Sequence, residues 1–233
     1  MLEETMTDHE KELSVKSKSG LRVSDGRREI VVCDTNILVY KAFDEIGISP
    51  SHSSRKIDSA IKKFGQLASK GNRMLMPKSV EKELKPVCER KLEEEDLDEE
   101  EKNRVRDGIK KYTKKYSPED LPVGTPIEGE EDYLKQVRSF YRSYPDKLSE
   151  ITQKKINNKP EKKHEILLER GEIFPTRGPT PSEGDIRLLA ECIRMNRLPI
   201  PRIWHISLLS NDSDFLWFTT EIEREFGIKI HNI

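Results

Sequence analysis

Acidic residues recur along this chain where predicted strands end and predicted helices begin. Asp34 follows a short apolar run, Glu83 lies in the first turns of a helical pattern, and Asp185 lies near the start of another. Asp212 and Asp214 directly follow a longer apolar run. Clusters of carboxylate oxygens suit Mg²⁺ or Mn²⁺, and a pair of such ions about 4 Å apart can activate water for phosphodiester cleavage. If these acids meet in the fold, they predict a divalent-metal site for phosphodiester hydrolysis.

Each acid also has an ordinary structural explanation. Asp185 could be a helix N-terminal acid favoured by the helix dipole, and Asp212 could be a cap or turn residue. Glu81 could be the inward-facing acid in place of Glu83, and Glu183 could replace Asp185. These alternatives stay open for single residues, but the recurrence of acids at equivalent points favours a common site.

Four apolar runs with little polar alternation indicate buried strands of a parallel sheet. They are Ile30 to Cys33, Met74 to Met76, Ile203 to Ser210 and Ile228 to Ile230. Helical spacing of apolar residues lies between them, at about 36–45, 53–70, after Pro77, from Ser182 and up to Phe226. This alternation predicts an α/β/α sandwich around a parallel sheet. Ligands bind at the carboxyl ends of such strands, which is where the acids fall.

Several residues predict where helices begin. Thr35 or Asn36 is a candidate cap for the helix after the first strand. Ser182 and Asp185 form an S-x-x-D version of the capping box. Pro77 suits the first turn of a helix, whereas Pro86 should disturb that helix early.

Composition limits the class of protein. The chain has 233 residues, a formal net charge of −1, 36% charged residues and 33% hydrophobic residues. No global basic field marks a nucleic-acid binder, and so polar a chain predicts a modest core with a large solvated helical part. Three widely spaced cysteines indicate a reducing compartment and no zinc site. No apolar stretch is long enough for a signal peptide or a membrane span, so we expect a cytoplasmic protein without membrane contact.

The composition changes in the middle of the chain. Residues 93–101 are almost entirely acidic, and residues 102–115 are strongly basic. We therefore expect residues 90–165 to be a charged, mostly helical and weakly packed insertion. Residues 1–28 have almost no apolar periodicity, which predicts a flexible N-terminal tail.

With these patterns together, the chain resembles the PIN-domain nuclease family. The matching stretches are residues 31–36, residues 77–84, residues 184–190 and residues 208–215. The resemblance implies a Rossmann-like domain made of 29–89 and 166–233, a divalent metal, Mg²⁺ or Mn²⁺, and hydrolysis of RNA. It also implies that the metal-binding carboxylates are Asp34, Glu83, Asp185, Asp212 and Asp214. The polar residues that would orient water, metal or phosphate are Thr35, Asn36, Ser210 and Ser213.

A carboxylate site that acts on a polyanion needs basic residues near it. The predicted insertion offers Lys102, Arg104, Arg106, Lys110, Lys111, Lys114 and Lys115. Tyr112, Tyr116 and Tyr141 lie among such residues and could stack on unpaired bases. Alternatively, the acidic run pairs with its own basic run in a solvated helical hairpin.

These expectations lead to a metal-dependent endoribonuclease that uses a metal-activated water. Two other functions stay open: a structure-specific DNA nuclease with the same metal site, and a non-catalytic RNA-binding or assembly module on the same fold. RNA is the expected partner, and the insertion could also bind a protein partner or a second copy of the chain.

Overall fold

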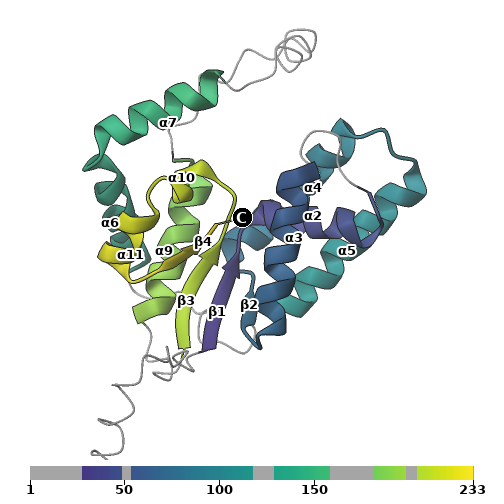
Figure 1. Cartoon of the computed structure of the whole chain (residues 1–233), viewed down its shortest axis with the longest axis horizontal. Helices are drawn as coiled ribbons and strands as arrows, with labels where there is room; N and C mark the ends of the chain where they lie inside the picture. The colour runs from purple at the N-terminus through teal and green to yellow at the C-terminus, as the bar shows by residue number, and fades with distance from the viewer. Residues whose placement is uncertain (1–27, 49–53, 118–128, 158–180, 198–203, 233) are drawn as a thin grey trace, which may run out of the picture.

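The computed structural model describes residues 28–48, 54–117, 129–157, 181–197 and 204–232. Within these residues, one sheet contains four strands, all parallel, in the order β2-β1-β3-β4 (Figure 1). The strands are β1 (Arg28–Cys33), β2 (Arg73–Leu75), β3 (Trp204–Leu209) and β4 (Lys229–His231). The predicted α/β class and parallel sheet are confirmed.

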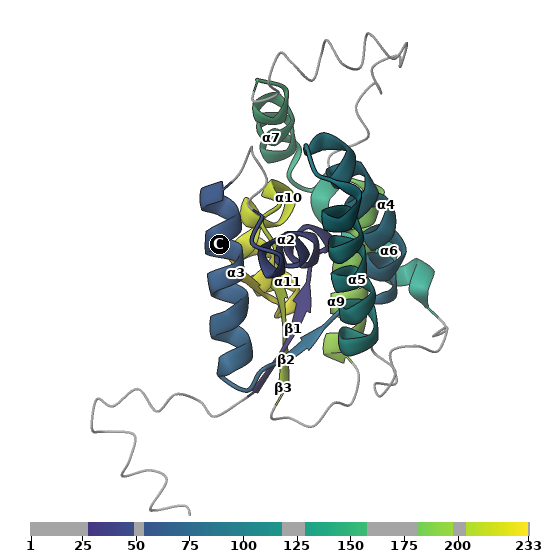
Figure 2. The same ribbon diagram turned by 90° about the vertical axis from the view of Figure 1, so that its right-hand side faces the viewer.

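Helices follow the strands and account for most of the described chain. They are α2 (Thr35–Glu45), α3 (Ser54–Ser69), α4 (Lys78–Glu94), α5 (Glu99–Tyr116), α6 (Glu130–Arg142), α7 (Pro145–Asn157), α9 (Glu183–Arg197), α10 (Ser213–Leu216) and α11 (Thr219–Phe226). Figure 2 shows α3 on one side of the sheet and α9 on the other. This arrangement is compatible with an α/β/α sandwich. No helix among the described residues is long and apolar enough to cross a membrane.

The centre of the sheet is built as the apolar runs predict. Val31, Val32 and Cys33 of β1 have no exposed surface. Val32 pairs with Leu75 of β2 on one side and with Leu208 of β3 on the other. Because β1 is buried on both faces and both edges, the residue that follows it emerges at the carboxyl edge of the sheet.

Pro86 does not disturb its helix, contrary to the prediction. Helix α4 continues through Pro86 to Glu94. Both Pro86 and Lys82, whose carbonyl loses its helical partner there, lie on the exposed side of the helix, where water can reach the carbonyl. The opposite side buries Leu84 and Cys88, and this packing outweighs the missing hydrogen bond.

The expectation of a weakly packed insertion is also wrong. Helix α5 buries Val105, Ile109, Tyr112 and Tyr116, and α6 buries Val137, Phe140 and Tyr141. At the contact between α5 and α2, a Cβ on Gly108 would lie 3.4 Å from the Cβ of Ala42, so the two helices approach closely. The apolar spacing in this charged segment therefore serves the main core. Residues 1–27, which include nearly all of the predicted tail, lie outside the described residues.

Candidate metal centre

Asp34 lies between the last residue of β1 and the first residue of α2. It occupies the N-cap position of α2, but its side chain makes no cap hydrogen bond. Its carboxylate instead accepts a hydrogen bond of 2.6 Å from the hydroxyl of Ser210, which follows β3. The predicted caps Thr35 and Asn36 are already helical. The structure thus leaves Asp34 facing the end of the neighbouring strand, with 6% of its surface exposed.

Ser210 connects Asp34 to the second group of acids. The same hydroxyl that donates to Asp34 accepts a hydrogen bond of 2.9 Å from the backbone amide of Asp212. Ser210 itself is fully buried. One serine therefore relates the end of β1 to the chain that leaves β3.

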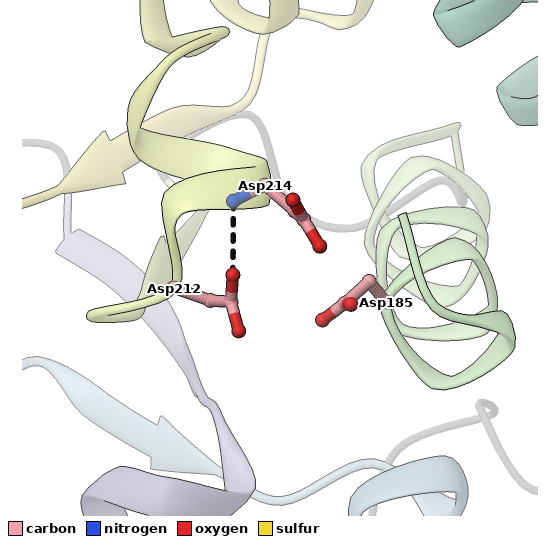
Figure 3. A group of neighbouring side chains, drawn as sticks. All are labelled: Asp185, Asp212 and Asp214. Carbon is pink, nitrogen blue, oxygen red and sulfur yellow. Dashed lines mark hydrogen bonds between the residues drawn. The ribbon is translucent and has the colours of Figure 1, made fainter. Parts of the chain in front are cut away.

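Asp212 and Asp214 lie at the beginning of the short helix α10. The Asp212 carboxylate caps this helix by accepting a 2.9 Å hydrogen bond from the amide of Asp214. Figure 3 shows this bond, and it shows the carboxylate of Asp185 facing both residues from α9. One carboxylate oxygen from each of Asp185, Asp212 and Asp214 lies within 4.8 Å of the others.

Asp185 reaches this position through the predicted capping box. Its carboxylate accepts hydrogen bonds from the backbone amide and the hydroxyl of Ser182. In return, the Ser182 hydroxyl accepts a 3.1 Å bond from the amide of Asp185. The capping box is therefore confirmed, and it fixes the carboxylate at the N-terminus of α9. The alternative acid, Glu183, faces away to Arg138 at 2.7 Å.

Glu83 approaches the same place from α4. Its carboxylate accepts a long hydrogen bond, 3.5 Å, from the hydroxyl of Thr35. It also lies against the backbone of Gly184, where a Cβ would come within 2.2 Å of the Glu83 Oε1 atom. Glu83 therefore adjoins both Asp34 and the start of α9. It is more exposed than the three aspartates of the compact group.

Burial and mutual repulsion change the acidity of this cluster. Burial raises the pKa of Asp34 to about 6; the hydrogen bond from Ser210 opposes this shift, and the charges of Asp212 and Glu83 add to it. Burial likewise raises the pKa of Asp185 to about 8, with a further contribution from the charge of Asp212. Both shifts mean that these carboxyls hold protons more tightly than free aspartic acid does.

The donor set fits a hard divalent cation. All three clustered donors are carboxylate oxygens, which Mg²⁺ and Mn²⁺ prefer. Oxygens on opposite sides of an Mg²⁺ ion lie about 4.2 Å apart, twice the usual ligand distance. The 4.8 Å limit on the three oxygens is close to that separation. The predicted acids therefore converge, with Asp185, Asp212 and Asp214 as the compact group and Asp34 and Glu83 beside it.

The other predicted polar residues lie at the edge of the cluster. Thr35 is buried and contacts Glu83, as described above. Ser213 donates a long hydrogen bond of 3.5 Å to Asp212. Asn36 is half-buried in the first turn of α2. Ser210 thus has the most direct contacts of the four, since it touches both Asp34 and Asp212.

The predicted basic residues of α5 mostly pair with acids. Salt bridges join Lys102 to Glu99, Arg106 to Glu89 and Glu99, Lys110 to Asp107, and Lys111 to Glu45. Arg104, Lys114 and Lys115 are exposed. In Figure 1, α5 lies on the β2 side of the sheet, whereas α10 lies on the β4 side. The acidic and basic runs pair in part with each other, as the alternative explanation anticipated.

The three tyrosines predicted to stack on bases are buried. Tyr112, Tyr116 and Tyr141 are 1%, 8% and 2% exposed. Their helical spacing marks the core face of α5 and α6, which is the usual meaning of such a pattern. They therefore cannot offer a ring face to a base without a change in the fold.

Sequence reasoning missed Trp217 near the cluster and assigned Tyr141 a different role. Trp217 is partly buried and lies three residues after Asp214, and the ammonium of Lys154 on α7 lies 4.1 Å from its ring centroid. Tyr141 donates a 3.0 Å hydrogen bond to the backbone carbonyl of Asp214. The position of Trp217 three residues after the last acid of the motif was the available signal. Nothing in the sequence pairs Tyr141 with Asp214, because 73 positions separate them.

Comparison with known proteins assigns this chain to no family. No family model, no curated protein and no solved structure matches this chain. The resemblance to PIN-domain nucleases therefore rests on the motifs and stays a prediction.

The shifted carboxyls predict how stability depends on pH without metal. The folded protein holds protons on Asp34 and Asp185 that the unfolded chain releases near pH 4, so the free energy of unfolding should fall as pH rises from about 4 to about 8. We expect a loss of at least about 3 kcal/mol, because the Asp34 shift from 3.8 to about 6 alone corresponds to that amount at about 1.4 kcal/mol per pKa unit. Urea unfolding in EDTA at several pH values measures it.

The matched control is Asp185→Asn, which should flatten this pH dependence. Adding Mg²⁺ or Mn²⁺ should restore stability, and more so at pH 8 than at pH 5, because protons and cations compete for the same oxygens. Wild-type stability that rises toward pH 8 in EDTA, relative to the variant, would contradict the cluster described here.

Gly184→Ala tests the place of Glu83. The added methyl would displace the Glu83 carboxylate, which is the far end of a flexible side chain. The fold should persist, since alanine is the better helix former by up to about 1 kcal/mol. We expect Gly184→Ala and Glu83→Gln each to weaken Mn²⁺ binding about 10- to 100-fold, and the double variant to be no worse than either alone.

Calorimetric titration with Mn²⁺ measures this effect. Gly65→Ala on α3 is the control, because nothing lies within 4 Å of a Cβ placed there. Wild-type Mn²⁺ affinity in Gly184→Ala would show that Glu83 takes no part in metal binding.

Proposed function

We propose that this chain is a divalent-metal-dependent endoribonuclease of PIN-like type. The observation that carries the proposal is the group formed by Asp185, Asp212 and Asp214 at the carboxyl edge of a parallel sheet. This edge is the ligand-binding edge of open α/β sheets. The choice of RNA as substrate rests on the resemblance of the motifs that carry these acids.

Each residue has a role in this proposal. Asp185, Asp212 and Asp214 hold Mg²⁺ or Mn²⁺, and Glu83 adds a carboxylate from α4. When bound, such an ion activates water and offsets charge on the phosphoryl oxygens. Ser210 holds the Asp34 carboxylate in place with its 2.6 Å hydrogen bond, so that Asp34 faces the cluster rather than capping α2.

Cleavage of a mixed panel of nucleic acids tests the proposal. The panel contains labelled single-stranded RNA, structured RNA, and single- and double-stranded DNA, each with Mn²⁺, Mg²⁺ or EDTA. We expect RNA cleavage that needs metal. Asp212→Asn should lower it by at least about 100-fold, since even residues behind the ligands of a metal site cost about 10- to 100-fold when changed.

Asp107→Asn is the matched control, because Asp107 is exposed on α5 and pairs with Lys110. Cleavage confined to DNA would replace the proposal with a DNA nuclease. If the protein binds RNA tightly without cleaving it, and Asp212→Asn binds RNA equally well, the protein would be an RNA-binding module instead.

Among the described residues near the cluster, Trp217 is a candidate to contact a base. It lies three residues after Asp214 on the same helical turn, which makes their side chains neighbours. Lys154 lies over its ring, is exposed and forms a salt bridge with Glu150, so a phosphate would compete with Glu150 for its ammonium group. We expect Trp217→Leu to raise KM for single-stranded RNA about 5- to 100-fold, because stacking contributes about 1–3 kcal/mol per base.

The value of kcat should change little, since Trp217 contributes no metal ligand. Steady-state kinetics on a short labelled strand separate the two effects, and Tyr133→Leu on α6 is the control for loss of a partly buried aromatic ring. An unchanged KM would exclude Trp217 from substrate binding.

A further inference from the structure

Helix α10 is too short to hold the acids at its start without help. It has four residues, Ser213–Leu216, and an isolated helix of that length is unstable in water. Asp212 and Asp214 therefore depend on tertiary contacts for their position. Ser210 supplies one of these contacts, through the amide of Asp212.

Tyr141 of α6 supplies a second contact. Its hydroxyl donates a 3.0 Å hydrogen bond to the backbone carbonyl of Asp214. The amide that would normally bond this carbonyl is that of Phe218, four residues later, but it donates to the carbonyl of Phe215. The Tyr141 hydroxyl takes its place at the end of the short helix.

The ring of Tyr141 is also held in place, by packing against other aromatic rings. It packs edge-on against Phe218 with ring centroids 5.1 Å apart, and against Phe140 at 5.2 Å. Only 2% of its surface is exposed. With two rotatable side-chain bonds and a packed ring, the hydroxyl has little freedom to follow a shift of α10.

The same side of α6 also contacts α9. Arg138, three residues before Tyr141, donates a 2.7 Å hydrogen bond to Glu183 in the first turn of α9. Glu183 lies two residues before Asp185. Helix α6 therefore touches both helices that carry the clustered carboxylates, α9 through Arg138 and α10 through Tyr141.

This double contact opposes the repulsion within the cluster. Asp185 on α9 faces Asp212 and Asp214 on α10 (Figure 3). Like charges at such distances push their helices apart when no cation lies between them. A rigid helix bound to both sides resists that separation.

We propose that Tyr141 is a positioning residue of the metal centre. Its hydrogen bond to Asp214 keeps the carboxylates at the start of α10 close enough to Asp185 for one ion to bind all three. This inference rests on the proposed metal site and deepens it. It assigns to α6, which lies in the charged middle of the chain, a role in metal affinity. Tyr141 contacts neither metal nor substrate and acts through Asp214.

Tyr141→Phe removes the hydroxyl and keeps the ring. We expect Mn²⁺ affinity, measured by calorimetric titration, to fall about threefold to tenfold, the range expected for one hydrogen bond. Hydrogen exchange at the amides of residues 210–218 should become faster in the metal-free protein. Tyr144→Phe is the matched control: Tyr144 packs on the same Phe140 and Phe218 rings, but its hydroxyl accepts a bond from Arg224.

Arg138→Met is a second variant, chosen because the Arg138 side chain is partly exposed and pairs with Glu183 of α9. It should weaken Mn²⁺ binding about twofold, in keeping with a surface ion pair. A Tyr144→Phe protein should match wild type in both Mn²⁺ affinity and exchange of residues 210–218.

The outcomes separate this inference from the proposed function. Faster exchange with unchanged Mn²⁺ affinity in Tyr141→Phe would make Tyr141 a structural residue only and overturn the inference. Unchanged exchange and affinity would overturn it as well, while wild-type RNA cleavage would still support the proposed function. Wild-type protein that binds no Mn²⁺ would overturn both.

Discussion

Repulsion among carboxylates at one edge of the sheet is the constraint that the surrounding structure has to meet. Asp34 and Asp214 are almost fully buried, and Asp185 and Asp212 are half-buried beside them. Buried charges of one sign are costly unless something compensates them. The pKa of Asp34 is raised to about 6 and that of Asp185 to about 8, with burial as the first cause in both. The cluster could therefore hold either protons or a cation.

The fold holds these carboxylates with hydrogen bonds from nearby hydroxyls and backbone amides, and these bonds oppose the repulsion between the carboxylates. Asp34 is fixed between β1 and α2, Asp185 lies in a capping box, and Asp212 caps its own helix. Ser210 then links two of these units through one hydroxyl that donates to Asp34 and accepts from Asp212. In each case a local interaction that stabilises a strand end or a helix start also aims a carboxylate at the common edge. The structural and functional explanations of these acids are thus compatible.

Local patterns in the sequence were sufficient to predict the sheet and part of the site. The apolar run of β1 indicates a buried parallel strand, and the Ser182–Asp185 spacing indicates the cap that the structure contains. Such local patterns could not predict contacts between residues that are far apart in the sequence. Helical spacing shows that Tyr141 has a buried side, but not that its hydroxyl meets Asp214. The approach of Glu83 to Gly184 depends on how α4 packs against α9, which spacing along either helix does not determine.

The charged middle of the chain shows why composition misleads about packing. Its acidic run supplies the capping box of α5, where Asp98 and Glu101 bond each other's backbone amides, and its basic run ends the same helix. Acidic residues at the start of a helix and basic residues at its end both interact favourably with the helix dipole. The two charged runs therefore mark the ends and the solvent-exposed side of α5, and do not indicate a separate module. The buried side of the segment is joined to the central sheet: the Tyr116 carbonyl accepts a 2.8 Å hydrogen bond from the amide of Met76, just after β2.

Tyr141 makes a corresponding contact after β3, where its hydroxyl donates a hydrogen bond to the carbonyl of Asp214. Removal of α5 and α6 would leave both backbone groups without these partners, and a buried polar group without a hydrogen bond costs about 1–3 kcal/mol. It would also expose the apolar surface that α9 presents to α6. A chain that lacks this segment would therefore be a destabilised domain, and not a smaller version of the same one.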